Sequence, residues 1–418
     1  MIATNTPTLR FGEFDEEWSE KRYGDIYSFY TTNSYSRDNL NYEKGTVRNI
    51  HYGDIHTKFS TMFYLEKEKV PFINEDIELN KIKDESYCQV GDLVIADASE
   101  DYADIGKTME IMSLNNEKTL AGLHTFLARP RKHDMVLGYT GYLLQSWKIR
   151  KQIMRIAQGT KVLSLSTKRL AHVILHIPTK PEQQKIATFL SAVDSSIEQL
   201  SKKEQLLRSY KKGVMQKIFS REIRFTLTPS TSSGNGETEK SVTEPVEVDD
   251  GGVFEDWVEK RLGDVLKIGS GKDYKHLKSG DIPVYGTGGY MTSVDSCLFD
   301  GKSVCIGRKG TINKPVLLDG KFWTVDTLFY THSYNGLLVE YFYHLALTIN
   351  WLKYNEGTTL PSLSKKTIEN IKINLPSLPE QTKIANFLSS LDKQIAQVSE
   401  QLAKKKAFKK ELLQQMFV

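Results

Sequence analysis

Gly159–Ser220 reads GTKVLSLSTKRLAHVILHIPTKPEQQKIATFLSAVDSSIEQLSKKEQLLRSYKKGVMQKIFS, and Gly357–Val418 reads GTTLPSLSKKTIENIKINLPSLPEQTKIANFLSSLDKQIAQVSEQLAKKKAFKKELLQQMFV. The two segments align without a gap at a constant offset, as from Pro181 to Pro379. A shorter repeat lies upstream of each, WSEKRYGD at 18–25 and WVEKRLGD at 257–264. An internal repeat of this kind decides the architecture, and it predicts two halves built on one plan.

Each repeated segment predicts a long helix. Pro181 and Pro379 suit the first helical turn, where a missing N–H costs nothing, and the glutamates that follow complement the positive end of the helix dipole. Apolar residues then recur at alternating spacings of four and three, which is typical of a heptad seam. The first copy carries them at Ile186, Leu190, Val193, Ile197, Leu200, Leu207, Val214 and Ile218. The second copy carries them at Ile384, Leu388, Leu391, Ile395, Val398, Leu402, Leu412 and Met416.

Such a seam needs a partner, and pseudo-twofold symmetry favours the other copy in an antiparallel coiled coil. The alternative is an amphipathic helix packed on its own domain; two gapless copies make this the weaker interpretation. The predicted fold is α+β, with two globular domains that are each followed by a long helix. The predicted boundaries are 11–178 for the first domain, 179–221 for its helix, 222–252 for a flexible linker, 253–376 for the second domain and 377–418 for its helix. The linker is rich in Ser, Thr, Gly, Pro and Glu, a composition that does not support a core.

Composition narrows the function. The chain has 418 residues, 56 Lys plus Arg against 52 Asp plus Glu, and a net charge of +4, so its overall charge barely favours a polyanionic partner. Three cysteines without metal-ligand spacing argue against structural zinc. The apolar runs are short and the first residues do not resemble a signal peptide, so we expect a cytoplasmic protein without a membrane partner.

Catalytic motifs are missing from the sequence. The Gly-Lys dipeptides at 106, 271 and 301 lack the first glycine of a phosphate-binding loop. There is no Pro-Pro dipeptide for the motif of an amino methyltransferase, and no Pro-Asp dipeptide to begin a nuclease motif. The sequence therefore predicts a non-catalytic protein. A fused methylase and nuclease is one alternative, but it would need these motifs; a pure coiled-coil scaffold is another, but it would not need two unlike globular domains.

The globular stretches share weak landmarks, which we use to predict loops that contact DNA. A Tyr-Gly pair recurs at 52–53 and 285–286, a turn followed by a buried strand and a polar loop recurs at 90–100 and 299–310, and Leu123–Phe126 resembles Val325–Leu328. Basic and aromatic residues on glycine-containing loops suit contact with phosphates and base edges, although the same loops could be solvated turns. The DNA-contacting residues predicted for the first half are Arg48, Tyr52, His56, Lys58 and Ser99. Those predicted for the second half are Lys272, Tyr274, Lys275, Arg308, Lys309 and Thr311.

The whole pattern resembles the specificity subunits of type I restriction-modification systems. The resemblance covers nearly the whole chain outside the linker, and its most specific motifs are IPTKPEQ at 177–183 and LPSLPEQ at 375–381. It implies two target-recognition domains that bind double-stranded DNA at an asymmetric bipartite site. It also implies a complex with two modification subunits, which use S-adenosylmethionine to methylate adenine, and with restriction subunits, which use ATP and Mg²⁺. By this resemblance the chain itself needs no cofactor.

We expect the outer faces of the two long helices to bind the modification subunits. The residues predicted to make these contacts are Gln183, Gln184, Lys185, Gln381 and Lys383. The sequence does not predict which DNA bases are recognised, the length of the gap between half-sites, which loop residues touch bases rather than phosphates, whether a restriction subunit is present, or the role of the long linker.

Overall fold

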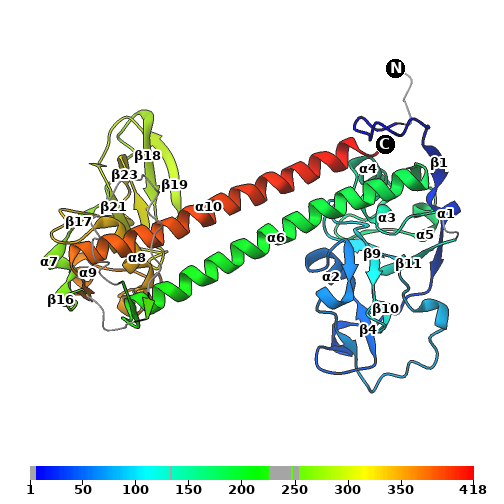
Figure 1. Ribbon diagram of the computed structural model, residues 1–418, viewed down its shortest axis with the longest axis horizontal. Helices are drawn as coiled ribbons and strands as arrows, with labels where there is room; N and C mark the ends of the chain where they lie inside the picture. The colour runs from blue at the N-terminus through cyan, green and yellow to red at the C-terminus, as the bar shows by residue number, and fades with distance from the viewer. Residues whose placement is uncertain (1–5, 132–133, 226–245, 248–253) are drawn as a thin grey trace, which may run out of the picture. The chain divides into compact units, whose positions relative to one another are not determined.

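The computed structural model describes residues 6–131, 134–225, 246–247 and 254–418 (Figure 1). It divides into two compact units, which we call the first unit (Met1–Leu200 with Gln401–Val418) and the second unit (Ser201–Glu400). Each unit is an α+β structure of short strands and short helices, to which parts of two long helices are added. The predicted fold class is confirmed.

Two mixed sheets form the body of the first unit. One has the strand order β2-β11-β7-β9-β5 and the other β10-β4-β6-β3, while β1 pairs with β13 and β12 with β8. The strands are β1 (Ser19–Arg22), β2 (Tyr27–Tyr30), β3 (Leu40–Asn41), β4 (Val47–Ile50), β5 (Met62–Tyr64), β6 (Phe72–Ile73), β7 (Leu93–Ala96), β8 (Ala98–Ser99), β9 (Thr108–Ser113), β10 (Lys118–Ala121), β11 (Thr125–Pro130), β12 (Leu163–Ser164) and β13 (Ile174–Ile177). The short helices are α1 (Tyr23–Ile26), α2 (Tyr52–Thr57), α3 (Tyr139–Leu143), α4 (Trp147–Ile156) and α5 (Thr167–Leu170).

The second unit has two four-stranded sheets, with the orders β17-β24-β21-β22 and β19-β18-β23-β20, and the pairs β16-β25 and β14-β15. The strands are β14 (Ile223–Arg224), β15 (Val246–Glu247), β16 (Val258–Arg261), β17 (Lys267–Ser270), β18 (Ser279–Gly286), β19 (Gly289–Val294), β20 (Phe299–Asp300), β21 (Ser303–Gly307), β22 (Val316–Leu318), β23 (Lys321–Thr324), β24 (Leu328–His332) and β25 (Lys372–Leu375). The short helices are α7 (Leu262–Val265), α8 (Val339–Thr348) and α9 (Lys365–Glu369).

The two long helices are α6 (Lys180–Phe219) and α10 (Leu378–Gln415), each beginning one residue before the predicted proline. They lie antiparallel in both units (Figure 1). In the second unit Lys211 pairs with Asp392, and Glu204 accepts a hydrogen bond from Ser399. The later residue of α6 thus meets the earlier residue of α10, which makes the two helices antiparallel. In the first unit Lys409 pairs with Asp194. The predicted antiparallel pairing is confirmed.

The predicted seam is largely buried in these packed helices. Ile186, Leu190 and Val193 belong to the core of the first unit, and Ile384, Leu388 and Leu391 belong to that of the second. Each core also takes in the end of the other long helix. Ile218 is buried in the second unit, while Phe417 is buried in the first, where it contacts Trp18 and Tyr139. The long helices are therefore part of both hydrophobic cores.

A buried ion pair fixes the start of each long helix. In the first unit both carboxylate oxygens of Glu182 accept hydrogen bonds from Arg10, at 2.7 Å each. In the second unit Glu380, the repeat counterpart of Glu182, accepts from Arg224 at 3.1 and 2.9 Å. Two ionised groups in a protein interior need this kind of mutual pairing. We call these pairs the first and second helix clamps.

The predicted linker boundary at residue 222 is wrong by a few residues. Ile223 and Phe225 are buried in the second unit, Arg224 makes the second helix clamp, and β14 pairs with β15. The segment Leu9–Phe11 of the first unit is the counterpart of Ile223–Phe225. Phe11 packs edge-on against Phe189, as Phe225 packs against Phe387. These residues are ordered because they pack against a helix that is distant in the sequence. Amino-acid composition does not predict such packing. The predicted linker residues 226–245 and 248–252 lie outside the described residues.

Candidate nucleic-acid interface

Three segments meet at one end of the sheets in the first unit. We call this meeting point the first junction and define it as residues 51–53 after β4, 97–99 after β7, and 122–125 from the end of β10 to the first residue of β11. The amide of Asp97 donates to the carbonyl of His124 at 3.0 Å, and the carbonyl of Asp97 accepts from the amide of Leu165 at 2.8 Å. The position of Asp97 is thus held by backbone hydrogen bonds on both sides.

Aromatic and imidazole rings gather at the first junction around Tyr52. Its ring centroid lies 4.7 Å from that of His51, 5.9 Å from His56 and 5.2 Å from His124. His124 adopts a left-handed backbone conformation with a φ of 53°, and its side chain is about half exposed at 52%. Its Nδ1 lies 3.3 Å from the carboxylate of Asp97, whose pKa is raised by burial against the opposing effect of His124. The junction therefore presents polar groups on a rigid frame.

A buried carboxylate anchors the helix that follows Tyr52. Asp54 has no exposed surface and pairs with Arg37 at 2.6 Å and with Lys58 at 2.8 Å. Burial alone would raise the pKa of Asp54, but the hydrogen bonds from Arg37 and Lys58 lower it. The same environment affects His51, whose pKa falls to about 4 because of burial and the nearby Arg37. We therefore expect Asp54 to stay charged and His51 to stay neutral near pH 7.

The second unit has a matching meeting point. We call it the second junction and define it as residues 285–287 at the end of β18, 308–310 after β21, and 325–327 between β23 and β24. The amide of Arg308 donates to the carbonyl of Thr327 at 2.7 Å, and the carbonyl of Arg308 accepts from the amide of Leu363 at 2.9 Å. Leu363 is the counterpart of Leu165 in the gapless alignment of the two repeated segments. Asp97 and Arg308 therefore occupy equivalent backbone positions.

The sheets around the two junctions are also equivalent. β4 runs parallel to β10 and β18 runs parallel to β23, in both cases leading into the junction. β7 pairs antiparallel with β11 through Ala96 and Thr125, while β21 pairs antiparallel with β24 through Gly307 and Leu328. The same backbone frame thus presents different side chains in the two units.

Exposed side chains surround the second junction. Tyr290 and Met291, on the hairpin strand β19, are 62% and 51% exposed. Lys309 is exposed and Arg308 half-buried, with its guanidinium 3.3 Å from the carbonyl of Asp326. Gly271 brings a further loop to the junction, because a Cβ at this residue would lie 1.9 Å from the carbonyl oxygen of Val325. Only glycine permits that approach.

Four of the eleven predicted DNA-contacting residues, Tyr52, Ser99, Arg308 and Lys309, lie in the junction segments, and several others lie close to them in the chain. In the first unit Tyr52 and His56 lie in the ring cluster, and Lys58 ends the helix that begins there. In the second unit Arg308 and Lys309 lie at the junction itself, and Thr311 follows them. Lys272 is next to Gly271, and its carbonyl accepts from the indole of Trp323 at 2.8 Å. Lys275 is exposed, whereas Tyr274 packs partly into the small core under β18.

Two residues predicted to contact DNA make contacts within the protein in this structure. Arg48 lies over the ring of Phe72, donates to Glu117 at 2.7 Å and donates to the carbonyl of Val70 at 2.7 Å, so part of its guanidinium is held by the protein. Ser99 is buried, and its hydroxyl accepts from the amide of Asp101 within a local turn. The counterpart of Arg308 is Asp97, which lies two residues before Ser99.

Two residues predicted to contact partner subunits are also misassigned. Gln183 and Gln381 are buried, at 1% and 0% exposed. Gln183 accepts from the amide of Val136 at 2.9 Å, and Gln381 accepts from the amide of Leu338 at 2.8 Å. Both glutamines join the start of a long helix to its own unit, so neither belongs to an outer face.

The other residues predicted to contact partners remain accessible in part. Gln184 is exposed and lines a cavity of about 240 Å³ between α6 and the residues around Gly138, together with the 42% exposed Leu137. Lys185 forms an ion pair with Glu13 and lies over the ring of Phe11. Lys383 is half-buried over the ring of Phe254.

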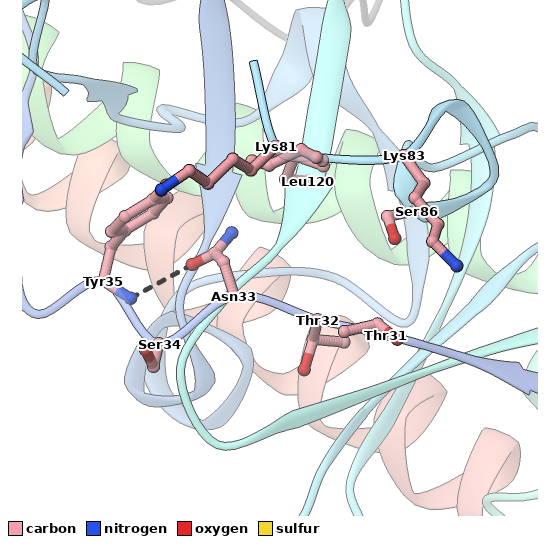
Figure 2. A pocket seen from close by; sticks show the side chains of 10 residues that line it. Thr31, Thr32, Asn33, Ser34, Tyr35, Lys81, Lys83, Ser86 and Leu120 are labelled. Carbon is pink, nitrogen blue, oxygen red and sulfur yellow. Dashed lines mark hydrogen bonds between the residues drawn. The ribbon is translucent and has the colours of Figure 1, made fainter. Parts of the chain in front are cut away.

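A polar cavity of about 340 Å³ borders the first junction, and no pattern in the sequence pointed to it (Figure 2). The run from Thr31 to Tyr35 forms one wall, and Lys81 and Lys83 reach over the other side. Thr32 donates to the carbonyl of Thr125 at 3.0 Å, and Asn33 donates to the carbonyl of Ala121 at 3.2 Å. These hydrogen bonds attach the cavity wall to the junction segment that carries His124.

Clusters of metal-ligating side chains and membrane-spanning helices do not occur in the part of the chain that the structure describes. The described residues contain no group of three or more His, Cys, Asp or Glu side chains that could hold a metal ion. Within them, no helix has both the length and the apolar character needed to cross a membrane.

Comparison with known proteins gives one consistent result. The family model described as "Type I restriction modification DNA specificity domain" matches residues 15–208 and 254–405. The MjaX type I restriction enzyme specificity subunit of Methanocaldococcus jannaschii is 25% identical over 412 residues, covering 93% of this chain and 90% of that protein. The MjaVIII specificity subunit of the same organism is 25% identical, covering 60% of this chain and 63% of that protein.

Solved structures agree on the fold. The S subunit of a type I restriction-modification system from M. genitalium superposes with a TM-score of 0.62 at 16% identity, covering 99% of both chains. The family model matches both units, and the repeated junctions and helix clamps repeat one plan in each. The chain belongs to the family of type I restriction-modification DNA specificity subunits.

Proposed function

We propose that this chain recognises an asymmetric bipartite DNA target and brings two modification subunits and the restriction subunits of a type I complex to it. The observation that carries the proposal is the pair of equivalent junctions with different side chains. One backbone frame used twice supplies two recognition elements, and different side chains on it read different half-sites.

Charge at the junctions supports DNA as the ligand. Lys272, Lys275 and Lys309 are exposed around the second junction, and Lys81 and Lys83 are exposed at the cavity beside the first. Lysines on loops contact phosphates and set the register of a protein on the duplex, whereas base edges are read by groups with fixed geometry. The rigid, hydrogen-bonded positions at the junctions suit the second task.

Partner binding belongs on the accessible parts of the long helices. Gln183 and Gln381 are buried, so the first candidates for contact with a modification subunit are Gln184 and the apolar Leu137, which line the 240 Å³ cavity. Apolar anchors in pockets carry much of the energy of protein interfaces. Lys185 and Lys383, at equivalent positions of the two helices, are the further candidates.

The chain itself is proposed to be non-catalytic and to use no cofactor. Its sequence lacks the methyltransferase and phosphate-loop motifs, so S-adenosylmethionine, ATP and Mg²⁺ are assigned to the partner subunits. The purified chain should neither methylate DNA nor hydrolyse ATP.

Selection from random duplexes tests the proposal. The full-length chain, co-expressed with the modification subunit from the same source, is incubated with duplex DNA that contains a randomised region, and bound duplexes are sequenced. We expect two short unlike motifs with a fixed unread gap. A single continuous palindrome, or enrichment of no motif at all, would contradict it. Replacing Leu137 with Asp should reduce recovery of the modification subunit, while the control Val162→Asp, another exposed apolar residue, should not.

A further inference from the structure

The strongest difference between the two junctions is a reversal of charge at one backbone position. Asp97 and Arg308 are each held by an amide that donates across to the next junction segment and by a carbonyl that accepts from the repeat segment, through Leu165 or Leu363. A carboxylate accepts hydrogen bonds only, whereas a guanidinium only donates them. The equivalent frames therefore offer opposite hydrogen-bonding chemistry at the same place.

The surroundings of each side chain fit a group that reads a base. The side chain of Asp97 is 22% exposed. Its neighbour at 3.3 Å is the imidazole of His124, which is itself half exposed. Arg308 is half-buried; its guanidinium makes a long hydrogen bond of 3.3 Å to the carbonyl of Asp326 and lies 5.8 Å from the ring centroid of Phe329. By contrast Arg48, which the sequence singled out, is engaged by Glu117, Val70 and Phe72.

Elementary base chemistry assigns the partners. In the major groove the amino group of cytosine is a donor, and carboxylates accept from it, while guanine offers two acceptors that match the fork of an arginine. We propose that Asp97 reads a cytosine in the half-site of the first unit and that Arg308 reads a guanine in the half-site of the second. This inference rests on the proposed function, since it assumes that the junctions contact DNA.

Amide substitutions test both residues while keeping a polar side chain at each position. Asp97→Asn keeps the shape, and its oxygen can still accept from His124, but the amide now both donates and accepts. Arg308→Gln shortens the side chain and replaces a group that only donates by an amide that both donates and accepts. Because Asn and Gln pair with adenine through two hydrogen bonds, each variant should exchange the preferred base for adenine at one position. The expected change in base preference is roughly 5- to 150-fold, which corresponds to the about 1–3 kcal/mol of a good base contact.

The experiment is the random-duplex selection on the full complex, carried out with wild type, Asp97→Asn, Arg308→Gln and two matched controls. The controls are Asp76→Asn in an exposed turn and Arg261→Gln on the exposed strand β16, and both should retain the wild-type motif. The half-site of the unaltered unit reports in the same reaction that each variant is folded. Thermal unfolding of each variant checks the altered unit.

The outcomes separate the two proposals. A one-position change in the half-site of the altered unit supports the inference. A wild-type bipartite motif that neither variant changes overturns the inference and leaves the proposed function standing. Loss of selectivity across a whole half-site, without a new base preference, shows that the residue only supports the junction and also overturns it. Absence of any motif with the wild type defeats the proposed function, and the inference falls with it.

Discussion

The ammonium group of Lys211 lies 2.5 and 2.6 Å from the two carboxylate oxygens of Asp392, and the repeat counterparts of these residues, Lys409 and Asp194, form the same pair. In the second unit His344 lies near Asp392, while in the first unit Tyr142 donates to Asp194 at 2.9 Å. Each pair joins α6 to α10, so the repeat is preserved in its side-chain contacts as well as in its backbone.

Removing Asp392 should destabilise the second unit. Asp392→Asn leaves the charge of Lys211, which is 12% exposed, without its partner. Because the Asp392 side chain is 42% exposed and solvent screens the pair, we expect a loss of about 1–2 kcal/mol in the free energy of unfolding. Urea unfolding measures it. The control Glu259→Gln breaks an exposed pair with Lys372 and should cost no more than about 1 kcal/mol. An equal loss in both variants would refute the special role of Asp392.

Acid should weaken the second unit through His344. Burial, and then the nearby Lys211, lower the pKa of His344 to about 4, against the opposing effect of Asp392 and Glu340. In the unfolded chain a histidine binds its proton near pH 6.5, so unfolding takes up a proton between about pH 6.5 and 4. The free energy of unfolding should therefore fall as the pH drops through this range, by at most roughly 1.4 kcal/mol per pH unit.

A neutral replacement should remove that contribution. His344→Gln cannot take up a proton, so its melting temperature should depend less on pH between 7.5 and 5 than that of the wild type. The matched control is His276→Gln at an exposed position, which should retain the wild-type dependence. If His344→Gln and the wild type show the same pH dependence, His344 does not titrate as inferred.

The second helix clamp should be among the costliest ion pairs to break. Glu380 has no exposed surface, and besides Arg224 it accepts from the indole of Trp257 at 3.1 Å. Glu380→Ala would leave a guanidinium that is 11% exposed with only the exposed Asp256, at 3.8 Å, and two backbone carbonyls as partners, at an expected cost of up to about 3–5 kcal/mol. Calorimetry should show a lower melting transition. The double variant Glu380→Ala, Arg224→Met should recover part of the loss, because no unpaired charge remains, and no recovery would contradict this explanation.

Deleting residues 226–251 should leave the second unit folded. The deletion joins Phe225 to Gly252, which reproduces the Phe11-Gly12 sequence of the first unit, although it also removes strand β15. The second helix clamp and the packing of Phe225 on Phe387 do not involve the deleted residues. The melting temperature and the selected DNA motif should match those of the wild type. A deletion that removes Ile223–Phe225 as well should lower the melting temperature, and tolerance of this longer deletion would contradict the assigned boundary.

The long helices were predicted from the heptad periodicity and from the repeat of the segment. The starts, direction and seam of α6 and α10 follow from the proline positions and from the spacing of residues such as Leu190 and Leu388. The prediction failed at Gln183 and Gln381, because a polar residue in a helix suggests an outer face unless its backbone partners are known. Val136 and Leu338, which donate to these glutamines, lie far from them along the chain, in the globular part of each unit.

The sequence pointed to the two junctions but did not pair their residues, and the contact of the junctions with DNA stays a prediction. The Tyr-Gly landmarks led to both junctions. The amino-acid sequence alone did not pair Asp97 with Arg308, because their equivalence rests on the backbone hydrogen bonds that each makes with Leu165 or Leu363. The second helix clamp was not predicted from the sequence, for a different reason. The long insertion after Phe225 separates Arg224 from Trp257, so the counterpart of the Arg10 to Trp18 segment is not contiguous.

The burial of Phe417 in the first unit has a consequence for synthesis of the protein. The ribosome makes the whole of the second unit, Ser201–Glu400, between the two parts of the first. Trp18 and Tyr139 must wait for Phe417, and at about 5–20 residues per second the wait lasts roughly 14 to 56 seconds for Tyr139 and longer for Trp18. The second unit is continuous in the chain, so its core does not depend on any residue made after Glu400. The first unit finishes its core last although it is translated first, and until then its apolar surface needs protection from aggregation.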